Sequence, residues 1–320
     1  MRFLFVMDPA TTMLPDKDTS FAFMRAAQDL GHTVYHCQPR DLFQRGADVF
    51  AMACVTQVSA APPHVTQTAP ELVEVAEMDA VLIRKDPPFD VAYAHLTQQL
   101  DLVKHRTLVV NDPAALRSAN EKLYAFHFVE HMPPSMVSAN PEQIRSFVVE
   151  VGGRAVLKPL DGAGGSGVVA LATDDPNTRA LIDLLTREGR ELALVQKYLP
   201  AIRTGDKRVL LLDGEPLGAI LRVPRPDDIR ANIHVGGQVQ PTELTPSEQA
   251  LVADMGPKLK AAGLWFVGLD LIGGHLIEVN VTSPTGIQEL GRFTGSRPEE
   301  AVIRWVATRA GELRTPALGA

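Results

Sequence analysis

The feature that most restricts this chain is the segment 266–285, FVGLDLIGGHLIEVNVTSPT, in which apolar residues alternate on both sides of two glycines. Alternation with a period of two predicts β-strands, and Gly273-Gly274 between them predicts a β-hairpin. Glu278 and Asn280 are two positions apart, so their side chains leave the second strand on the same face. The segment therefore predicts antiparallel sheet in the last third of the chain, with two oxygen-bearing side chains on one face.

A third oxygen ligand, Asp270, lies on the first strand of this hairpin. Asp270 shares the face of Glu278 and Asn280 only if the strand pairing is centred on Gly274. We therefore expect a three-residue turn, 273–275, in place of a two-residue Gly-Gly turn. Two carboxylates and one amide oxygen suit a hard divalent cation, Mg²⁺ or alternatively Mn²⁺, with positions left for phosphate oxygens. The alternative is a solvated polar face on an edge strand, so the rest of the chain must decide.

The composition is that of an ordinary globular protein, with 320 residues, 45% apolar and 22% charged, and a net charge of -7. This length predicts two or three domains. The negative charge argues against a nucleic-acid-binding surface, and no apolar run approaches the roughly 18 residues of a membrane span. Cys37 and Cys54 are too few for a disulfide framework. We therefore expect a cytoplasmic protein with no nucleic-acid or membrane partner.

The first third of the chain alternates strand and helix patterns, which is typical of a doubly wound sheet. The expected strands are 2–7, 33–37, 81–83 and 108–110, and the expected helices are 18–30 and 91–105. Residues 55–70, rich in Thr, Gln, Ala and Pro, are expected to be irregular or to form an edge excursion.

The pattern changes at Asn120. From there a helix is expected to His131, where Pro133-Pro134 stops it, followed by a helix from about Pro141 and a strand at 155–158. These elements predict a small α+β domain in the middle of the chain.

The last third adds strands and helices around the hairpin. Strands are expected near 208–212 and 218–223, and a helix is expected from Pro246 to Ala262. Thr245, followed by Glu248 three positions later, forms a capping box for that helix.

Residues 162–167, GAGGSG, satisfy the G-x-G-x-x-G pattern of dinucleotide-binding loops. The next residues, 168–171, are VVAL and predict a returning strand, whereas a dinucleotide fold needs a helix there. The loop is therefore expected to join two strands. Its backbone N–H groups can approach phosphates, and Lys158 on the entering strand supplies a cation. The alternative is a hairpin tip without a ligand.

Residues 194–200, LVQKYLP, predict a strand that ends at a proline. Exposed backbone at such a domain junction can pair with the edge of an adenine. The alternative is an ordinary core strand.

The order of these features resembles the ATP-grasp superfamily and, within it, the bacterial glutathione synthetases. The resemblance covers most of the chain and rests on eight blocks in the same order. The blocks are Met7-Asp8-Pro9, Lys17-Asp18-Thr19-Ser20-Phe21, Arg84-Lys85-Asp86-Pro87-Pro88-Phe89-Asp90, Asn120-Glu121-Lys122-Leu123, Lys158-Pro159-Leu160-Asp161-Gly162, Tyr198-Leu199-Pro200, Gly205-Asp206-Lys207-Arg208-Val209 and Glu278-Val279-Asn280-Val281-Thr282-Ser283-Pro284-Thr285.

This resemblance implies an ATP-grasp fold of mixed α/β and α+β class in three domains. An N-terminal doubly wound, Rossmann-like domain would span 1–120, and a small central lid domain would span 121–200. A C-terminal antiparallel-sheet domain would span 201–320, with the ATP-grasp region at about 122–307. A homo-oligomer, with a tetramer as its expected form, is also implied.

The activity implied by the resemblance is ATP-dependent ligation of γ-glutamylcysteine to glycine, with ATP as co-substrate. By motif position, ATP would be held by Lys122, Lys158, Gly162, Gly164, Gly165, Ser166, Gly167, Gln196, Lys197, Tyr198, Leu199 and Asp206. The dipeptide or glycine would be held by Asp18, Ser20, Arg84, Lys85, Asp86, Gly236, Gly237, Ser283, Pro284 and Thr285. The metal would be held by Asp270, Glu278 and Asn280.

A carboxylate is a poor electrophile, and transfer of the γ-phosphoryl group turns it into an acyl phosphate that an amine can attack without a protein nucleophile. Fixed cations must neutralise charge during that transfer, and Arg208, Arg222 and Arg230 are the candidates. The acyl phosphate must also be kept from water. Residues 223–238, which end near Gly236-Gly237, are expected to form a lid that brings Arg230 to the site.

Two other functions remain open from the sequence. One is an ATP-grasp ligase for a different acid and amine, against which the block at 84–90 argues. The other is a non-catalytic nucleotide-binding module. A pure binder need not keep the metal ligands together with Lys122, Lys158 and Arg208, so we expect an enzyme.

Overall fold

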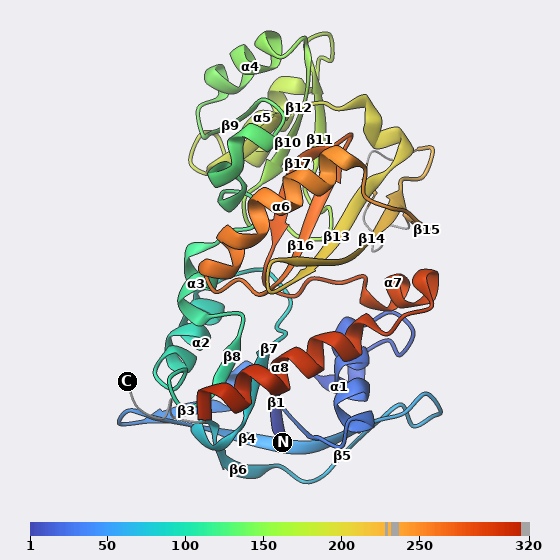
Figure 1. The fold of residues 1–320 in the computed structure, drawn as a ribbon. Coiled ribbons are helices and arrows are strands. Elements are labelled where there is room, and N and C mark those ends of the chain that lie inside the picture. The colour runs from blue at the N-terminus through green and yellow to red at the C-terminus, as the bar shows by residue number, and fades with distance from the viewer. Residues whose placement is uncertain (228–229, 232–236, 315–320) are drawn as a thin grey trace, which may run out of the picture.

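The computed structural model describes residues 1–227, 230–231 and 237–314. Within those residues the chain forms three sheets. In Figure 1 the N-terminal sheet is at the bottom, the central sheet is at the top, and the C-terminal sheet lies between them. The last part of the chain therefore lies next to both of the others.

The N-terminal sheet has the strand order β3-β4-β2-β1-β7-β8, with β5 and β6 paired to β4. Strands β2, β1, β7 and β8 run parallel, and the remaining strands extend one side of the sheet in antiparallel fashion. The bounds are β1 Arg2–Val6, β2 Thr33–Cys37, β3 Leu42–Arg45, β4 Asp48–Val58, β5 Val65–Gln67, β6 Glu71–Glu74, β7 Ala80–Ile83 and β8 Leu108–Val110. The segment 55–70 thus contains the end of β4 and the edge strand β5, and an edge excursion was one of the two forms expected for it.

Helices cover both faces of this sheet. Phe3 and Phe5 of β1 share a buried cluster with α1 (Thr19–Asp29) and α8 (Pro298–Arg314). Leu4 and Val6 share the opposite cluster with α2 (Val91–Asp101), beside which lies α3 (Pro113–Ser118). The doubly wound arrangement predicted from the strand and helix alternation is therefore confirmed. The C-terminal helix α8 returns to the first sheet and shares one of its two helical layers with α1 (Figure 1).

The central sheet is antiparallel and has the order β11-β10-β12-β9. Its bounds are β9 Ser135–Ser138, β10 Arg154–Pro159, β11 Val169–Ala172 and β12 Ala193–Lys197, with helices α4 Pro141–Glu150 and α5 Thr178–Leu185. Ile144 and Ile182 of the helices and Leu157 of the sheet are fully buried in a core of their own. Because β10 pairs with β11, the glycine loop joins two strands, as predicted.

The C-terminal sheet is antiparallel and has the order β15-β14-β13-β16-β17. Its bounds are β13 Asp206–Leu212, β14 Glu215–Val223, β15 Gln238–Pro241, β16 Phe266–Ile272 and β17 His275–Asn280, with helices α6 Pro246–Ala261 and α7 Ile287–Thr294. The predicted capping box at the start of α6 is present, with Thr245 and Glu248 each accepting a hydrogen bond from the other's backbone.

The hairpin β16–β17 has the predicted pairing at the oxygen ligands but reaches it differently. The turn is the two-residue Gly273-Gly274, so the expected three-residue turn, 273–275, is wrong. Both glycines have positive φ, which this tight turn requires. A β-bulge leaves Ile277 as an extra residue and shifts the register by one, so Asp270 lies opposite Glu278. The bulge thus has the same effect on register as the longer turn would have had.

The helix expected up to His131 is wrong in type. The segment forms the 3-10 element η4 (Tyr124–His131), which is interrupted at Phe128, where φ is -130° and ψ is 41°. Phe128 is 1% exposed, so burial of its ring outweighs regular helix at this point. The other 3-10 turns are η1 Ala10–Thr12, η2 Pro39–Asp41, η3 Val75–Glu77 and η5 Pro200–Thr204. Across the described part of the chain, no helix is both long and apolar enough to cross a bilayer.

Candidate active site

A cavity of about 880 Å³ is lined by all three parts of the chain. The predicted site residues in its wall are Asp18, Arg84, Asp86, Lys122, Lys158, Gly162, Gly164, Gly165, Ser166, Gln196, Lys197, Tyr198, Leu199, Asp206, Arg208, Arg222, Arg230, Asp270, Glu278, Asn280, Ser283 and Thr285. Among described residues, Ser20, Lys85, Gly167, Gly237 and Pro284 are not part of the wall, and Gly236 lies outside the described residues. Most of the predicted site thus converges on one space.

The three predicted metal ligands lie together on one face of the hairpin. Asp270 and Glu278 are directly paired, and the Asn280 Nδ2 donates to Asp270 Oδ2 at 3.2 Å and to the Gly268 carbonyl at 3.1 Å. The amide nitrogen is therefore used by the protein, which leaves the Asn280 oxygen as its donor atom for a cation. Two carboxylates and an amide oxygen fit a hard divalent ion.

Two buried arginines bind the central carboxylate of this group. Arg208 donates to Asp270 through Nε at 2.5 Å and Nη2 at 3.0 Å. Arg222 binds Asp206 through Nε at 2.6 Å and Nη2 at 2.8 Å, and its Nη2 also lies 3.0 Å from Asp270 Oδ2. Burial opposes ionisation of Asp270, but the two guanidinium groups outweigh it and hold the pKa of Asp270 well below its usual range. The site is thus a network of four buried charges.

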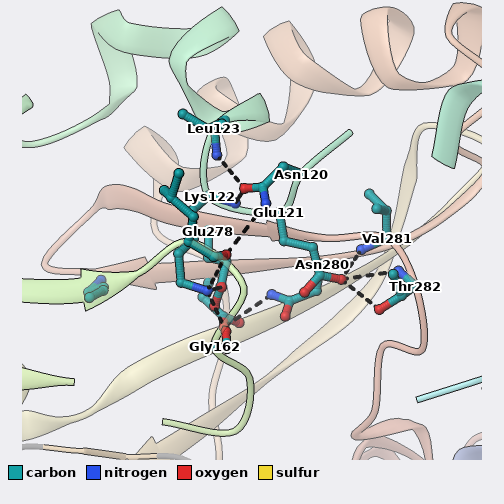
Figure 2. Close-up of polar contacts among 12 residues, drawn as sticks. Asn120, Glu121, Lys122, Leu123, Gly162, Glu278, Asn280, Val281 and Thr282 are labelled. Atoms are coloured by element: carbon teal, nitrogen blue, oxygen red, sulfur yellow. Dashed lines mark hydrogen bonds and ion pairs between the residues drawn. The ribbon is translucent and has the colours of Figure 1, made fainter. Parts of the chain in front are cut away.

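Lys122 connects Glu278, one of the predicted metal ligands, to the glycine loop, as Figure 2 shows. Its Nζ lies 3.0 Å from Glu278 Oε1 and donates to the Gly162 carbonyl and, at 3.4 Å, to the Leu160 carbonyl. Asn120 accepts from the Lys122 N–H through its side-chain oxygen at 3.1 Å, which fixes the turn that carries the lysine. Lys122 is 5% exposed, so its charge acts in an interior of low dielectric.

Glu121 holds the strand with the metal ligands against the segment with Lys122 (Figure 2). Its Oε1 accepts from Val281 N at 2.9 Å, Thr282 N at 3.1 Å and Thr282 Oγ1 at 2.8 Å. Its own carbonyl accepts from Val279 N at 3.0 Å. Burial raises the pKa of Glu121, and a neighbouring carboxylate adds to the rise. Glu121 belongs to the motif block 120–123, but its position in the sequence predicted no role for it.

The glycine loop packs too closely for larger residues. A Cβ on Gly162 would lie 2.7 Å from Pro159 Cγ and 2.9 Å from the Ser166 carbonyl oxygen. Gly164, Gly165 and Gly167 have positive φ, which side chains rarely adopt. The loop therefore places bare backbone over the cavity.

Lys158 enters the cavity from β10 at the base of this loop. Its Nζ donates to Gln196 Oε1 at 2.6 Å, and Gln196 in turn donates to Ser135 Oγ at 3.1 Å. Burial lowers the pKa of Lys158 to about 8. The Gln196 side chain therefore orients a lysine, a role that the sequence analysis did not assign to it.

The segment expected to meet adenine is partly used by the sheet. The N–H groups of Lys197 and Tyr198 donate to the carbonyls of Pro134 at 2.9 Å and Arg154 at 3.2 Å. The Arg154 guanidinium carbon also lies 4.5 Å from the centre of the Tyr198 ring. These two N–H groups are therefore not available to a ligand, whereas Leu199, the next residue, also lines the cavity.

Arg84 forms the opposite end of the cavity, after β7. Its Nε donates to Ser20 Oγ at 3.1 Å and its Nη2 donates to the Pro284 carbonyl at 3.0 Å. Its guanidinium carbon lies 5.6 Å from the ring centre of Phe23 and 5.8 Å from that of Phe266. Burial lowers the pKa of Arg84. Ser20 and Pro284, which were predicted to bind substrate, are thus placed to hold the arginine.

The neighbouring predicted residues have structural partners as well. Asp18 caps α1, with Oδ1 accepting from Ser20 N at 2.7 Å. Lys85 Nζ lies 3.2 Å from Asp8 Oδ2, an atom that also accepts from Asp86 N at 3.2 Å. Asp8 thus fixes the chain next to Arg84.

The expected lid, 223–238, is described only in part. Strand β14 ends at Val223 and β15 begins at Gln238. Between them, Arg230 and Ala231 line the cavity, and Ala231 is 2% exposed and packs against Tyr198. Arg230 is therefore at the site, where it was expected, and residues 228–229 and 232–236 of the expected lid lie outside the described residues.

Comparison with known proteins decides the family. The model for the prokaryotic glutathione synthetase N-terminal domain matches residues 1–117, and the model for its ATP-grasp domain matches residues 121–295. The chain belongs to the prokaryotic glutathione synthetase family. The resemblance to the bacterial glutathione synthetases and the predicted activity, ATP-dependent ligation that forms glutathione, are thereby confirmed.

Curated relatives extend over nearly the whole chain. A glutathione synthetase from a Nostoc species is 43% identical and the match covers 96% of this chain and 98% of the relative. The glutathione synthetase of Gloeobacter violaceus is 42% identical, and the match covers 99% of both chains. This membership argues against the two other functions that the sequence left open.

Solved structures share the fold at low sequence identity. A D-cycloserine synthetase superposes with a TM-score of 0.65 at 17% identity, covering 98% of this chain and 100% of that one. A RiPP-associated ATP-grasp ligase from Chryseobacterium gregarium, in complex with ADP and a leader and core peptide, has a TM-score of 0.65 at 14% identity, with 97% of each chain covered. The predicted ATP-grasp fold is confirmed by these likenesses.

Proposed function

We propose that the chain joins γ-glutamylcysteine to glycine through an acyl phosphate on the cysteinyl carboxylate. The γ-phosphoryl group of ATP is transferred to that carboxylate, and the glycine amine then attacks the acyl carbon and displaces phosphate. The observation that carries this proposal is that the metal ligands, Lys122, Lys158 and Arg84 line one cavity. Nucleotide and acid can therefore meet without the intermediate leaving the protein.

ATP is assigned to the space between the central and C-terminal sheets. Its phosphates would lie under the glycine loop, against Lys122 and Lys158, whose ammonium groups are held at fixed positions by Glu278 and Gln196. Preorganised cations need no reorganisation as charge shifts during phosphoryl transfer. The adenine would lie by the segment 196–199. The remaining ATP residues of the proposal are Gly162, Gly164, Gly165, Ser166, Gly167 and Asp206.

Asp270, Glu278 and Asn280 would hold the divalent ion, which we propose is Mg²⁺, with Mn²⁺ as the alternative. When bound, such an ion would neutralise part of the charge on the phosphates of ATP. The chain's own cations serve the same end. Arg208 and Arg222 converge on Asp270 and are buried, so their charges act with little screening on a phosphoryl group next to that carboxylate.

The dipeptide is assigned to the end of the cavity formed by Asp18, Arg84 and the loop 283–285. Arg84 is buried and fixed by two hydrogen bonds, which suits recognition of a substrate carboxylate. Lys85 and Asp86 would support this end, and Gly236 and Gly237 would belong to the covering lid with Arg230. A closed lid would keep water from the acyl phosphate.

Phosphate release tests the proposal. Purified protein is mixed with ATP, Mg²⁺, γ-glutamylcysteine and glycine, and each component is omitted in turn. We expect release only in the complete mixture, loss of release with EDTA, and recovery on adding Mg²⁺ or Mn²⁺. Equal phosphate release with glycine omitted would refute the proposed order of steps through an acyl phosphate. An undiminished rate of release with EDTA would refute the metal assignment.

We further propose a cytoplasmic homo-oligomer, with a tetramer as its expected form. Cys37 and Cys54 are free thiols, which supports a reducing compartment. Sedimentation equilibrium would give the subunit number directly, and a monomer at micromolar concentration would refute the oligomer.

A further inference from the structure

Glu289 is a buried acid in the wall of the cavity. Neither a sequence motif nor the family resemblance assigned a role to this residue. It lies in the first turn of α7 and is 5% exposed. Its Oε1 lies 3.2 Å from Arg292 Nη2, a side chain that is half-exposed. Its Oε2 is buried and has no hydrogen-bond partner among the described residues. A buried carboxylate oxygen without a partner is costly, so it calls for a ligand.

Glu289 is held in place by the helix that carries it. Gln288 Nε2 donates to the Asp18 carbonyl at 2.6 Å, and Arg292 Nη1 donates to the Asp16 carbonyl at 2.7 Å. Ile287, on the same helix, is 0% exposed. These contacts fix the helix that carries the carboxylate, so the position of Glu289 next to the cavity is part of the fold.

The surroundings of Glu289 match an amino-acid head group. Arg84 lines the same cavity and is bound to Pro284, the residue two positions before the glycine that starts α7. Asp18 lines it as well, and its carbonyl is bonded to α7. A zwitterionic α-amino acid needs a cation for its carboxylate and an anion for its ammonium group. Arg84 supplies the first, and Glu289 is the buried anion at this end of the cavity.

We propose that Glu289 binds the α-ammonium group of the γ-glutamyl moiety and so selects a dipeptide with a free amine. This inference rests on the proposed function. The other ammonium among the substrates belongs to glycine, but that amine must lose its proton to attack the acyl phosphate. A buried carboxylate stabilises the protonated form, which is suited to the amine that does not react and opposes reaction of the one that does.

The experiment compares γ-glutamylcysteine with N-glutarylcysteine, which lacks only the α-amino group, in wild type and in Glu289→Gln. The readout is kcat/KM from phosphate release with saturating ATP and glycine. Wild type should prefer γ-glutamylcysteine by about 10- to 100-fold, the range for losing one charged hydrogen bond. The substitution should bring this preference to within about threefold, while kcat/KM for N-glutarylcysteine changes little. The KM for glycine should stay unchanged.

Arg292→Gln is the matched control. It removes the ion pair of Glu289 and the bond to the Asp16 carbonyl but not the carboxylate, and Gln288 still bonds α7 to the Asp18 carbonyl, so the preference for the free amine should persist. If Arg292→Gln abolishes the preference as Glu289→Gln does, the carboxylate acts only through the ion pair and the proposal is overturned. An unchanged preference in Glu289→Gln, or a raised KM for glycine with an unchanged preference, would overturn it as well.

Wild type alone gives an independent test should Glu289→Gln fail to fold. Equal kcat/KM for the two dipeptides in wild type means that no group reads the α-ammonium, and this refutes the proposal without any variant. Failure of the proposed function is distinguishable, since wild type would then release no phosphate with γ-glutamylcysteine and glycine.

Discussion

The substitution Asp270→Asn tests the buried charge network at the centre of the site. Asp206, Arg208, Arg222 and Asp270 are each at most 8% exposed and balance two negative charges with two positive ones. Removing the Asp270 charge leaves Arg208 buried without its carboxylate, since Arg222 retains Asp206. Breaking a buried ion pair from one side costs about 3–5 kcal/mol, so we expect that loss in the free energy of unfolding.

A second substitution separates the effect of the unpaired charge from the loss of the proposed metal ligand. On the Asp270→Asn background, Arg208→Met removes the unpaired guanidinium and keeps an apolar side chain in its place. Replacing a whole buried pair by apolar groups is close to neutral, so the double variant should regain about 2 kcal/mol. Ligase activity should stay at least about 10²-fold reduced in both variants, because both lack the carboxylate and the double variant also lacks one cation.

Urea unfolding is the assay, followed by fluorescence of Trp265 and Trp305 and by circular dichroism. The two probes must give coincident transitions before free energies are compared. Asp213→Asn, at a surface ion pair with Lys260, serves as the control and should cost no more than about 1 kcal/mol. A double variant as unstable as Asp270→Asn alone would refute the argument, because the unpaired charge would then contribute nothing.

The contacts of Lys158, Gly162 and Glu121 each give a further prediction. Since burial lowers the pKa of Lys158 to about 8, its ammonium group deprotonates as the pH rises from 7 to 9, and ATP affinity measured by calorimetry should fall over that range. In Lys158→Met the affinity should be low at both pH values, and a wild-type affinity independent of pH would contradict the assignment. Gly162→Ala places a Cβ 2.7 Å from Pro159 Cγ, so the KM for ATP should rise by roughly tenfold. The control Ala163→Gly should leave the KM for ATP within about threefold of the wild-type value. Equal effects of the two substitutions would mean that the close approach at Gly162 is unimportant. Glu121→Ala removes the acceptor of three hydrogen bonds, so the free energy of unfolding should fall by about 2–3 kcal/mol and nucleotide affinity should fall as well. Glu121→Gln keeps one acceptor oxygen and should retain most of the stability and of the affinity. Equal losses in the two variants would show that the charge matters more than the hydrogen bonds.

The local pattern of apolar, polar and glycine residues in the sequence predicted much of the fold and of the site. The alternation of strands and helices in the first third, the capping box at Thr245 and the return of the glycine loop into a strand were all confirmed, because each depends on residues close in sequence. The hairpin turn was predicted wrongly for a related reason. Strand alternation does not reveal an extra residue such as Ile277, and a bulge and a longer turn place Asp270 opposite Glu278 equally well.

The family and its motif residues could be recognised from the chain alone, because metal ligands, glycines and lysines occur there in a fixed order. Their partners could not, because they are contacts between distant segments. The pairing of Arg208 with Asp270 joins residues 62 positions apart, and the bond from Arg84 to Pro284 joins residues 200 apart. The burial of Glu121 and Glu289 and the return of α8 to the first sheet likewise arise only when three sheets pack together. An isolated carboxylate in a sequence is usually a solvated side chain, and burial within the fold is what gives it a role.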